Sequence, residues 1–207
     1  MSNEKNNQPA VPPQAAAADA AEGGDSQSLL AKMAAGIEFA NNRVADGEGR
    51  AQRLHRVRHS TAHVMAEAVL QMFPEARFGA GPAVENGFYY DMELPRPLVP
   101  ADVDEIERRM KKIIKRGWPF QLAQVPLDQA RALFDGAHQP FKLEILDKIA
   151  SRGETTVSLF RQNQFIDLCA GPHVSSTGKL KFFKLTKQGA AYWQNKAGNP
   201  MLQRVYG

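Results

Sequence analysis

Apolar side chains recur with helical spacing over residues 51–73, on two opposite faces. A heptad-like stripe holds Leu54, Val57, Thr61, Met65, Ala68 and Met72, and a second face holds Ala62, Ala66, Leu70 and Phe73. Between them lies a narrow polar strip of Arg53, Arg56, Ser60, Glu67 and Gln71. The pattern predicts a helix that is buried on two sides and stops at Pro74.

Residues 100–117 carry the signals of a complete amphipathic helix. Pro100 suits the first helical position, acidic residues follow it near the positive end, and lysines and Arg116 lie near the negative end. Gly117 suits the left-handed residue that closes a helix. The predicted buried stripe consists of Val103, Ile106, Met110, Ile113 and Ile114.

The remaining segments mix short helices and strands. Ser28 is a candidate N-cap for a helix over 29–41, and further helices are predicted over 127–134 and 141–149. The predicted strands are 88–92, 119–125, 155–160, 165–168, 181–187 and 190–193, with 201–206 as a strand or the start of a helix. The order lacks a regular βαβ alternation. It favours an α+β fold with a mostly antiparallel sheet packed against helices.

Residues 1–27 are rich in Pro, Ala, Gln, Asn and Gly and hold almost no large apolar side chain. Such a segment cannot bury enough surface to offset its ordering entropy, so a disordered N-terminal tail is predicted. Residues 46–49 read Asp-Gly-Glu-Gly, which is typical of a linker. We therefore expect a tail over 1–27, a short helix and linker over 28–50, and one domain over 51–207.

The net charge of +4 is distributed unevenly over the 207 residues. Residues 1–50 hold 4 basic and 7 acidic side chains, so 22 basic and 15 acidic side chains lie in residues 51–207. This surplus suits a polyanionic partner such as RNA. Cys169 is the sole cysteine, which excludes an internal disulfide. Neither a membrane span nor a secretory signal is evident, so a cytoplasmic protein without a membrane partner is expected.

Two pairs of candidate ligands have the same spacing. His59 and His63 lie four residues apart on one helix face, at the border of the polar strip, and are expected at the rim of a site. Cys169 and His173 repeat the spacing, but Gly171-Pro172 disfavours a helix there. One thiol and three imidazoles suit zinc. The alternative is a set of partly buried imidazoles with a structural role.

Six segments in register identify a resemblance. RHSTAHVMAEAV, ENGFYYDMEL, PFKLEILD, FIDLCAGPHV, GAAYW and MLQRVYG follow one another over residues 58–207. In order and spacing they resemble the second N-terminal domain of bacterial threonyl-tRNA synthetases, the editing domain, which is related to the editing modules of alanyl-tRNA synthetases. The likeness covers about residues 51–207.

The resemblance implies hydrolysis of seryl-tRNA(Thr). Serine and threonine differ by one methyl group, worth about 1–3 kcal/mol, so a synthetic site needs a second, smaller pocket to remove serine. Water would attack the ester, assisted by a positioned base and a donor for the oxyanion. By resemblance, His59 and His173 orient water or ribose hydroxyls, Lys142 assists the oxyanion or water, and Asp167 binds the substrate ammonium.

The same resemblance suggests which residues shape the pocket. His63 and Cys169 are expected to bind substrate, with Cys169 acting by its shape and not as a nucleophile, and Tyr89 or Tyr90 to line the sieve. The alanyl relatives hold zinc with such a set, whereas the threonyl version is not thought to require it. We therefore expect no required cofactor, with His59, His63, Cys169 and His173 as the ligands of any zinc that binds.

Lys181, Lys184 and Lys187 alternate with aromatic and apolar residues over 179–187. We predict phosphate contacts with a tRNA acceptor stem there, against the alternative of a strand with a solvated lysine face.

Two departures from the family leave alternatives open. Ala170 stands where the family commonly has arginine, and neither a preceding ubiquitin-like domain nor a following synthetase core is present, so no threonine ligation is expected. An excised or free-standing aminoacyl-tRNA deacylase is favoured. The alternatives are a noncatalytic tRNA- or ligand-binding module, as in fusions with nucleoside-kinase-like proteins, and a structural zinc domain. Its partners would be tRNA and a synthetase or fused domain.

Overall fold

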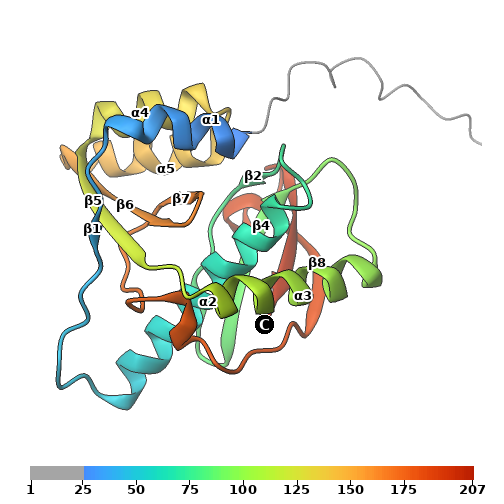
Figure 1. The fold of residues 1–207 in the computed structure, drawn as a ribbon. Helices are drawn as coiled ribbons and strands as arrows, with labels where there is room; N and C mark the ends of the chain where they lie inside the picture. The colour runs from blue at the N-terminus through green and yellow to red at the C-terminus, as the bar shows by residue number, and fades with distance from the viewer. Residues whose placement is uncertain (1–25) are drawn as a thin grey trace, which may run out of the picture.

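Two antiparallel sheets organise residues 26–207, the part of the chain that the computed structural model describes (Figure 1). The first sheet has the order β1 (Ala40–Asn41), β5 (Phe120–Pro126), β6 (Thr156–Gln162) and β7 (Phe165–Leu168). The second has the order β2 (Arg77–Phe78), β4 (Gly87–Glu93), β9 (Met201–Tyr206) and β8 (Lys187–Tyr192), with β3 (Ala83–Val84) also pairing with β4. The predicted α+β class with antiparallel sheets is confirmed.

Each sheet has its own helices. In Figure 1, α1 (Ser26–Met33), α4 (Leu127–Gly136) and α5 (Pro140–Ala150) lie over the first sheet, and α2 (Arg50–Leu70) and α3 (Pro100–Arg116) pack against the second. Within residues 26–207, three short 3-10 helices complete the set: η1 (Ala34–Gly36), η2 (Thr177–Lys179) and η3 (Trp193–Asn195). Among the described helices, none is both long enough and apolar enough to cross a bilayer.

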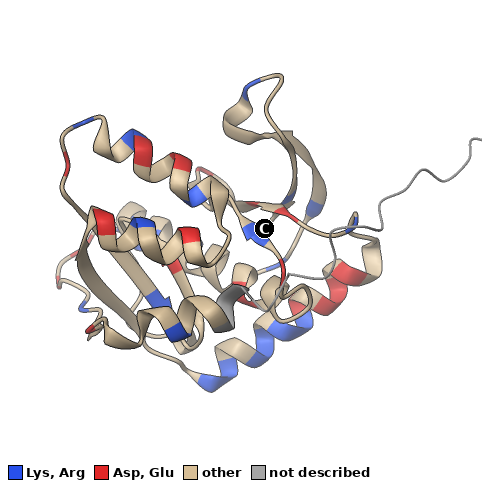
Figure 2. Ribbon diagram, turned by 90° about the horizontal axis from the view of Figure 1, so that it is seen from above, with Lys and Arg blue, Asp and Glu red and all other residues tan. Residues whose placement is uncertain are grey.

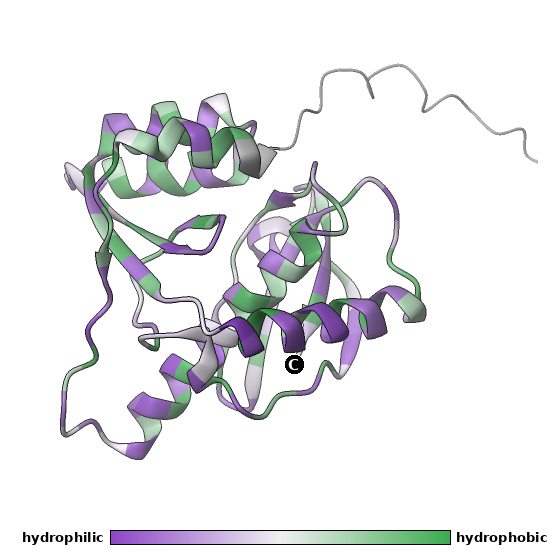
Figure 3. Cartoon of the chain, in the orientation of Figure 1, coloured by the Kyte–Doolittle hydropathy of each residue, from purple (hydrophilic) through white to green (hydrophobic). Residues whose placement is uncertain are grey.

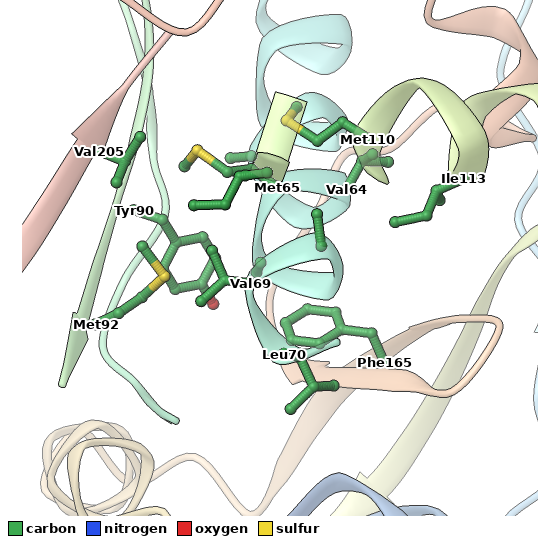
Figure 4. Packing of buried hydrophobic residues seen from close by; sticks show 14 of the residues in the cluster. Val64, Met65, Val69, Leu70, Tyr90, Met92, Met110, Ile113, Phe165 and Val205 are labelled. Atoms are coloured by element: carbon green, nitrogen blue, oxygen red, sulfur yellow. The ribbon is translucent and has the colours of Figure 1, made fainter. Parts of the chain in front are cut away.

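The larger core surrounds α2. Figure 4 shows Val64, Met65 and Val69 of this helix among side chains of α3, β4 and β9, with Phe165 of β7 at the same core. Every residue from 60 to 70 is buried, so the helix is enclosed on all sides over its second half. The expected polar strip is wrong for this half, because Ser60 and Glu67 are buried. Their side chains form hydrogen bonds with the segments around His173 and Asn163.

α3 agrees closely with its prediction. Pro100 begins it, and the Asp102 carboxylate accepts a hydrogen bond from the Val99 backbone N–H at 2.8 Å. Paired hydrogen bonds from Arg96 lower the pKa of Asp102 to about 2. Acidic side chains gather toward the N-terminal end of α3 and basic ones toward its C-terminal end, as Figure 2 shows, and its outer face is mainly hydrophilic in Figure 3. Gly117 closes the helix with φ of 66°.

The structure corrects the N-terminal predictions. The predicted helix over 29–41 is shorter and begins earlier, as Ser26–Met33, so Ser28 lies inside it and is not its N-cap. Ala40 and Asn41, at the end of the predicted helix, form strand β1 instead. They pair with Leu122 and Gln121 of β5, so their backbone groups bond to a sheet and not along a helix. Residues 1–25 of the predicted tail lie outside the described residues. The division of the chain at residue 51 stays a prediction.

The predicted strand over 181–187 is also wrong. Residues 181–186 form no strand, since the Leu185 backbone N–H donates to the Glu107 side chain of α3, at 3.2 Å, instead of to a neighbouring strand. Leu180 and Leu185 are buried while Phe182 is 92% exposed, so the segment does not alternate as a sheet would require. The strand begins at Lys187 and ends at Tyr192, before Trp193.

Replacing Gly117 by alanine should lower the free energy of unfolding by about 1 kcal/mol, because a Cβ disfavours the left-handed conformation. Space is not the cause, since that Cβ would have only Ser176 Oγ nearby, at 3.8 Å. Urea denaturation checks the change. Gly36→Ala is the matched control, because Gly36 has an ordinary φ and open space around it. Equal losses in the two variants would contradict the assignment.

Candidate active site

A cavity of about 330 Å³ opens where the two sheets meet. Its walls come from α2, from α5, from the chain between β2 and β3, and from the end of β7. The lining residues are His55, His59, His63, Gly79, Ala80, Gly81, Pro82, Ala83, Lys142, Ile145, Asp167, Leu168, Cys169, Ala170 and Gly171. Most are small or apolar, and a few polar groups converge among them, as is typical of ligand sites.

Lys142 and Asp167 form a buried ion pair on the cavity floor. Lys142 Nζ lies 2.5 Å from Asp167 Oδ1 and donates to the Gly79 carbonyl at 2.7 Å. The Tyr90 hydroxyl donates to Asp167 Oδ2 at 2.5 Å. Burial, together with the Asp167 charge, raises the pKa of Tyr90 well above its ordinary value, so this hydroxyl keeps its proton. A charged and hydrogen-bonded floor thus joins α5, β4 and β7.

The four predicted ligands do converge. The donor atoms of His59, His63, Cys169 and His173 lie within 4.8 Å of one another. Cys169 Sγ is 3.4 Å from His59 Nε2 and 3.2 Å from His173 Nε2. Cys169 and His173 approach each other through a turn in which Gly171 has a φ of 72°. A Cβ at Gly171 would lie 3.1 Å from the Phe160 ring. Glycine therefore permits both the turn and its packing.

Burial keeps this cluster neutral. It lowers the pKa of His59 to about 4, and it lowers the pKa values of His63 and His173 well below their ordinary value. Burial also raises the pKa of the Cys169 thiol to about 12, with a further contribution from the Asp167 charge. At neutral pH the site therefore holds three uncharged imidazoles and a protonated thiol beside one ion pair. Uncharged imidazoles can accept protons or bind a metal.

His173 is held from behind by groups that do not reach the cavity. Its Nδ1 lies 3.1 Å from Ser60 Oγ, and the same oxygen accepts the Val174 backbone N–H at 3.0 Å. The Phe120 ring stacks on the imidazole at 4.8 Å with an interplanar angle of 8°. Asn42 Nδ2 donates to the His173 carbonyl at 2.6 Å. The His173 ring is thus fixed in place, although it does not line the cavity.

The rim prediction holds for one histidine of α2 and fails for the other. His59 is half-buried at the cavity wall, whereas His63 is only 1% exposed. The reason is the second half of α2, which is enclosed on every side. His63 Nε2 lies 3.4 Å from Asp167 Oδ2, so this histidine joins the helix to the ion pair.

The two tyrosines point to opposite faces of β4. Tyr90 lies behind the cavity wall, against Gly81, where an added Cβ would be 2.2 Å from the ring. Tyr89 does not line the cavity: the Arg204 guanidinium lies over its ring at 4.0 Å, and the Tyr206 ring is 5.8 Å away. The structure therefore brings Tyr90, and not Tyr89, to the polar floor.

The three lysines of the predicted tRNA contact have different neighbours. Lys184 Nζ pairs with Glu107 of α3 at 2.9 Å, and Lys187 lies 4.5 Å over the Tyr206 ring of β9. Lys181 is exposed. None of the three lines the cavity.

Sequence reasoning missed His55, Ser60 and the wall at residues 79–83. His55 lies one turn before His59 on α2, is exposed, and has its ring 6.1 Å from the His59 ring. The spacing of four was a usable signal for it. No local signal marks the wall, because Gly79 and Asp91 meet only through pairing of distant strands, with the Gly79 N–H donating to the Asp91 carbonyl at 2.8 Å.

Comparison with known proteins supports the same relationship. The sequence profile of the family described as "Threonyl and Alanyl tRNA synthetase second additional domain" matches residues 157–206. Threonine–tRNA ligase from Dehalococcoides mccartyi strain BAV1 is 53% identical over 154 residues, which cover 74% of this chain and 26% of the ligase. The ligase of Azoarcus sp. strain BH72 is 51% identical over 73% of the chain and 23% of its own length.

This region belongs to the editing-domain family of threonyl-tRNA synthetases. A third relative, the threonine–tRNA ligase of Bacillus velezensis strain FZB42, is 45% identical over 77% of the chain and 25% of its own length. The chain thus spans about a quarter of the curated relatives it matches. Within the editing-domain match, residues 157–206 include Asp167, Cys169 and His173, while α2 and α5 bring the other half of the site.

Replacing Lys142 by methionine should cost about 3–5 kcal/mol of unfolding free energy, because Asp167 would remain buried without its cation. The double variant with Asp167→Asn should regain most of that loss, since both charges are then gone. Urea denaturation of the single and double variants measures it. Lys148→Met, at the exposed end of the same helix, is the control. A loss at position 142 no larger than at 148 would contradict a stabilising ion pair.

Proposed function

We propose that this chain is a hydrolytic editing domain that removes serine from seryl-tRNA(Thr). The observation that carries the proposal is the cavity in which a buried ion pair lies beside the neutral imidazoles of His59 and His63, with the neutral His173 packed behind its wall. Such a site offers both a proton acceptor and a cation to an ester. Membership of the editing-domain family supports the choice of an aminoacyl-tRNA as the ester.

The reaction needs water to add to the ester carbonyl and the ribose oxygen to leave with a proton. We assign His59, which faces the cavity, to orient and accept a proton from that water. Lys142 Nζ provides the positive charge for the developing oxyanion. Asp167, paired with Lys142 in the free protein, binds the substrate ammonium. His63 and His173 hold Asp167 and Cys169 in place, at 3.4 Å and 3.2 Å.

Cys169 acts by its shape and by hydrogen bonding in this scheme. With its pKa raised to about 12, the thiol is protonated at neutral pH and is a poor nucleophile. The backbone N–H of Gly171 donates to Cys169 Sγ at 3.2 Å, which fixes the sulfur at the cavity wall. Water can hydrolyse the ester directly, so no covalent intermediate is needed.

Zinc is a compatible ligand but not a required one in this proposal. Three imidazoles and one thiol, with donor atoms within 4.8 Å, fit the usual donor set of the ion. His59, His63, Cys169 and His173 would hold it. When bound, zinc would polarise an ester carbonyl or activate water. The ion pair and the neutral histidines supply the roles above by themselves.

Substrate selection would follow from the size of the cavity. A pocket that admits serine and excludes the extra methyl of threonine gains about 1–3 kcal/mol of discrimination. The partner would be tRNA, contacted by basic residues that include Lys181, and a synthetase to which this domain is joined or which it assists in the cytoplasm.

Serine release from preformed seryl-tRNA(Thr) should be rapid with this chain, while threonyl-tRNA(Thr) stays intact. His59→Ala and His173→Ala should each lower the rate about a hundredfold, because the first removes the base and the second frees Cys169. The rate should survive a metal chelator. His138→Ala, an exposed histidine outside the cavity, is the control. Tight tRNA binding without any release would indicate the noncatalytic binding module instead.

His55→Gln should raise the KM for seryl-tRNA about tenfold while kcat changes less than twofold, because an exposed imidazole at the cavity mouth is placed to contact the terminal nucleotide. Hydrolysis of a small serine ester should be unaffected. His138→Gln controls for the loss of an exposed imidazole. If the two variants have the same KM for seryl-tRNA, His55 does not contact the substrate.

A further inference from the structure

α2 carries a row of four ionisable residues at intervals of four: His55, His59, His63 and Glu67. Residues with this spacing lie along one helix face. The row runs from the exposed His55, past the half-buried His59, to His63 and Glu67, which are 1% and 2% exposed. The first three line the cavity, and Glu67 lies one turn deeper. The proposed reaction has no role for it.

Glu67 contacts the hairpin that carries Asp167. Asn163 Nδ2 donates to Glu67 Oε1 at 2.9 Å, and Asn163 forms the turn between β6 and β7 with φ of 49°. Asp167 follows four residues later on β7, where His63 Nε2 lies 3.4 Å from its Oδ2. α2 therefore holds the β6–β7 hairpin at two points one helical turn apart, and the second point is part of the cavity floor.

The Glu67 carboxyl lacks a balancing charge. No ion pair to it is found within residues 26–207, and the groups that act on it from the end of β6 and the following turn are the uncharged amides of Gln162 and Asn163. On α2 the neighbouring member of the row, His63, is neutral. Burial raises the pKa of Glu67 to about 7, although both amides lower it.

The buried side chain of Gln162 allows two arrangements at this point. Glu67 Oε2 and both polar atoms of the Gln162 amide are buried and form no hydrogen bond of standard geometry, although this amide is close enough to Glu67 to lower its pKa. An ionised carboxylate can only accept a hydrogen bond, whereas a protonated carboxyl can also donate one. Since an amide offers both a donor and an acceptor, Gln162 can serve either form after a rotation. The contact between helix and hairpin thus differs between the two forms.

We propose that Glu67 is a positioning residue whose proton sets, through Gln162 and Asn163, how the β6–β7 hairpin holds Asp167 opposite His63. The site would then respond to pH near neutrality, through a group that never touches the substrate. The effect on serine release rests on the proposed function. The coupling of Glu67 to His63 and Asp167 does not.

The coupling can be measured without any substrate. In long-range ¹H–¹⁵N spectra of the full chain, the His63 ring nitrogens should shift between pH 6 and pH 8 with a midpoint of about 7. The shift should vanish in Glu67→Gln, which keeps the shape of the side chain and removes the charge. Glu75→Gln, at an exposed glutamate after α2, should leave it unchanged. A His63 transition that persists in Glu67→Gln would overturn the proposal.

Unfolding provides a second readout. Because the pKa of Glu67 is raised from 4.5 in the unfolded chain to about 7, its stabilisation is complete below pH 4.5 and is lost as the pH rises to about 7. The folding constant of the wild type, relative to Glu67→Gln, should therefore fall by up to tenfold per pH unit in that window. If the folding constants of the wild type and of Glu67→Gln changed in parallel with pH, the proposal would also be overturned.

Serine release then tests the consequence for the site. Asn163→Gly removes the side-chain contact and keeps a residue that tolerates positive φ. It should lower kcat about fivefold and leave KM unchanged, and Glu67→Gln should flatten the kcat profile between pH 6 and pH 8. If the wild type releases no serine, the proposed function fails while the spectra still decide the coupling. If it releases serine and both variants match it, the positioning role fails alone.

Discussion

The ion pair between Lys142 and Asp167 is the interaction on which the rest of the site depends. It joins a helix above the first sheet to a strand within that sheet, and the Gly79 carbonyl and the Tyr90 hydroxyl bring in the second sheet. Burying two charges is costly unless their hydrogen bonds are complete. The Gly79 carbonyl and the Tyr90 hydroxyl offset part of that cost, and both belong to segments that pair in the second sheet.

The same constraint governs the histidines. The burial that surrounds the ion pair also withholds solvent from the imidazole side chains, and so keeps them uncharged at neutral pH. One cation and several neutral acceptors thus follow from a single physical cause, the burial of these side chains. An ester needs this combination for attack by water.

The sequence predicted local features well and long-range ones unevenly. α3 carries its start, its stop and its buried stripe within one segment, and it forms as expected. The convergence of His59 and His63 with Cys169 and His173 came from spacing together with a family likeness. The strand expected over 181–187 was wrong because Glu107, distant in sequence, takes its backbone hydrogen bond. Periodicity places Ser60 and Glu67 on a narrow polar strip, and it does not show that the helix is enclosed on all sides there.

One cavity wall is built from main chain. At Gly79 and Gly81 an added Cβ would meet Trp193 at 2.7 Å and the Tyr90 ring at 2.2 Å, so these positions accept no side chain on that side. The Trp193 and Tyr90 rings thus pack directly behind this stretch of backbone and fix the position of the wall. A smaller side chain in place of Tyr90 would leave room behind this wall and would also withdraw a hydrogen bond from Asp167. The position of the wall and the electrostatics of the floor therefore depend on the same residue.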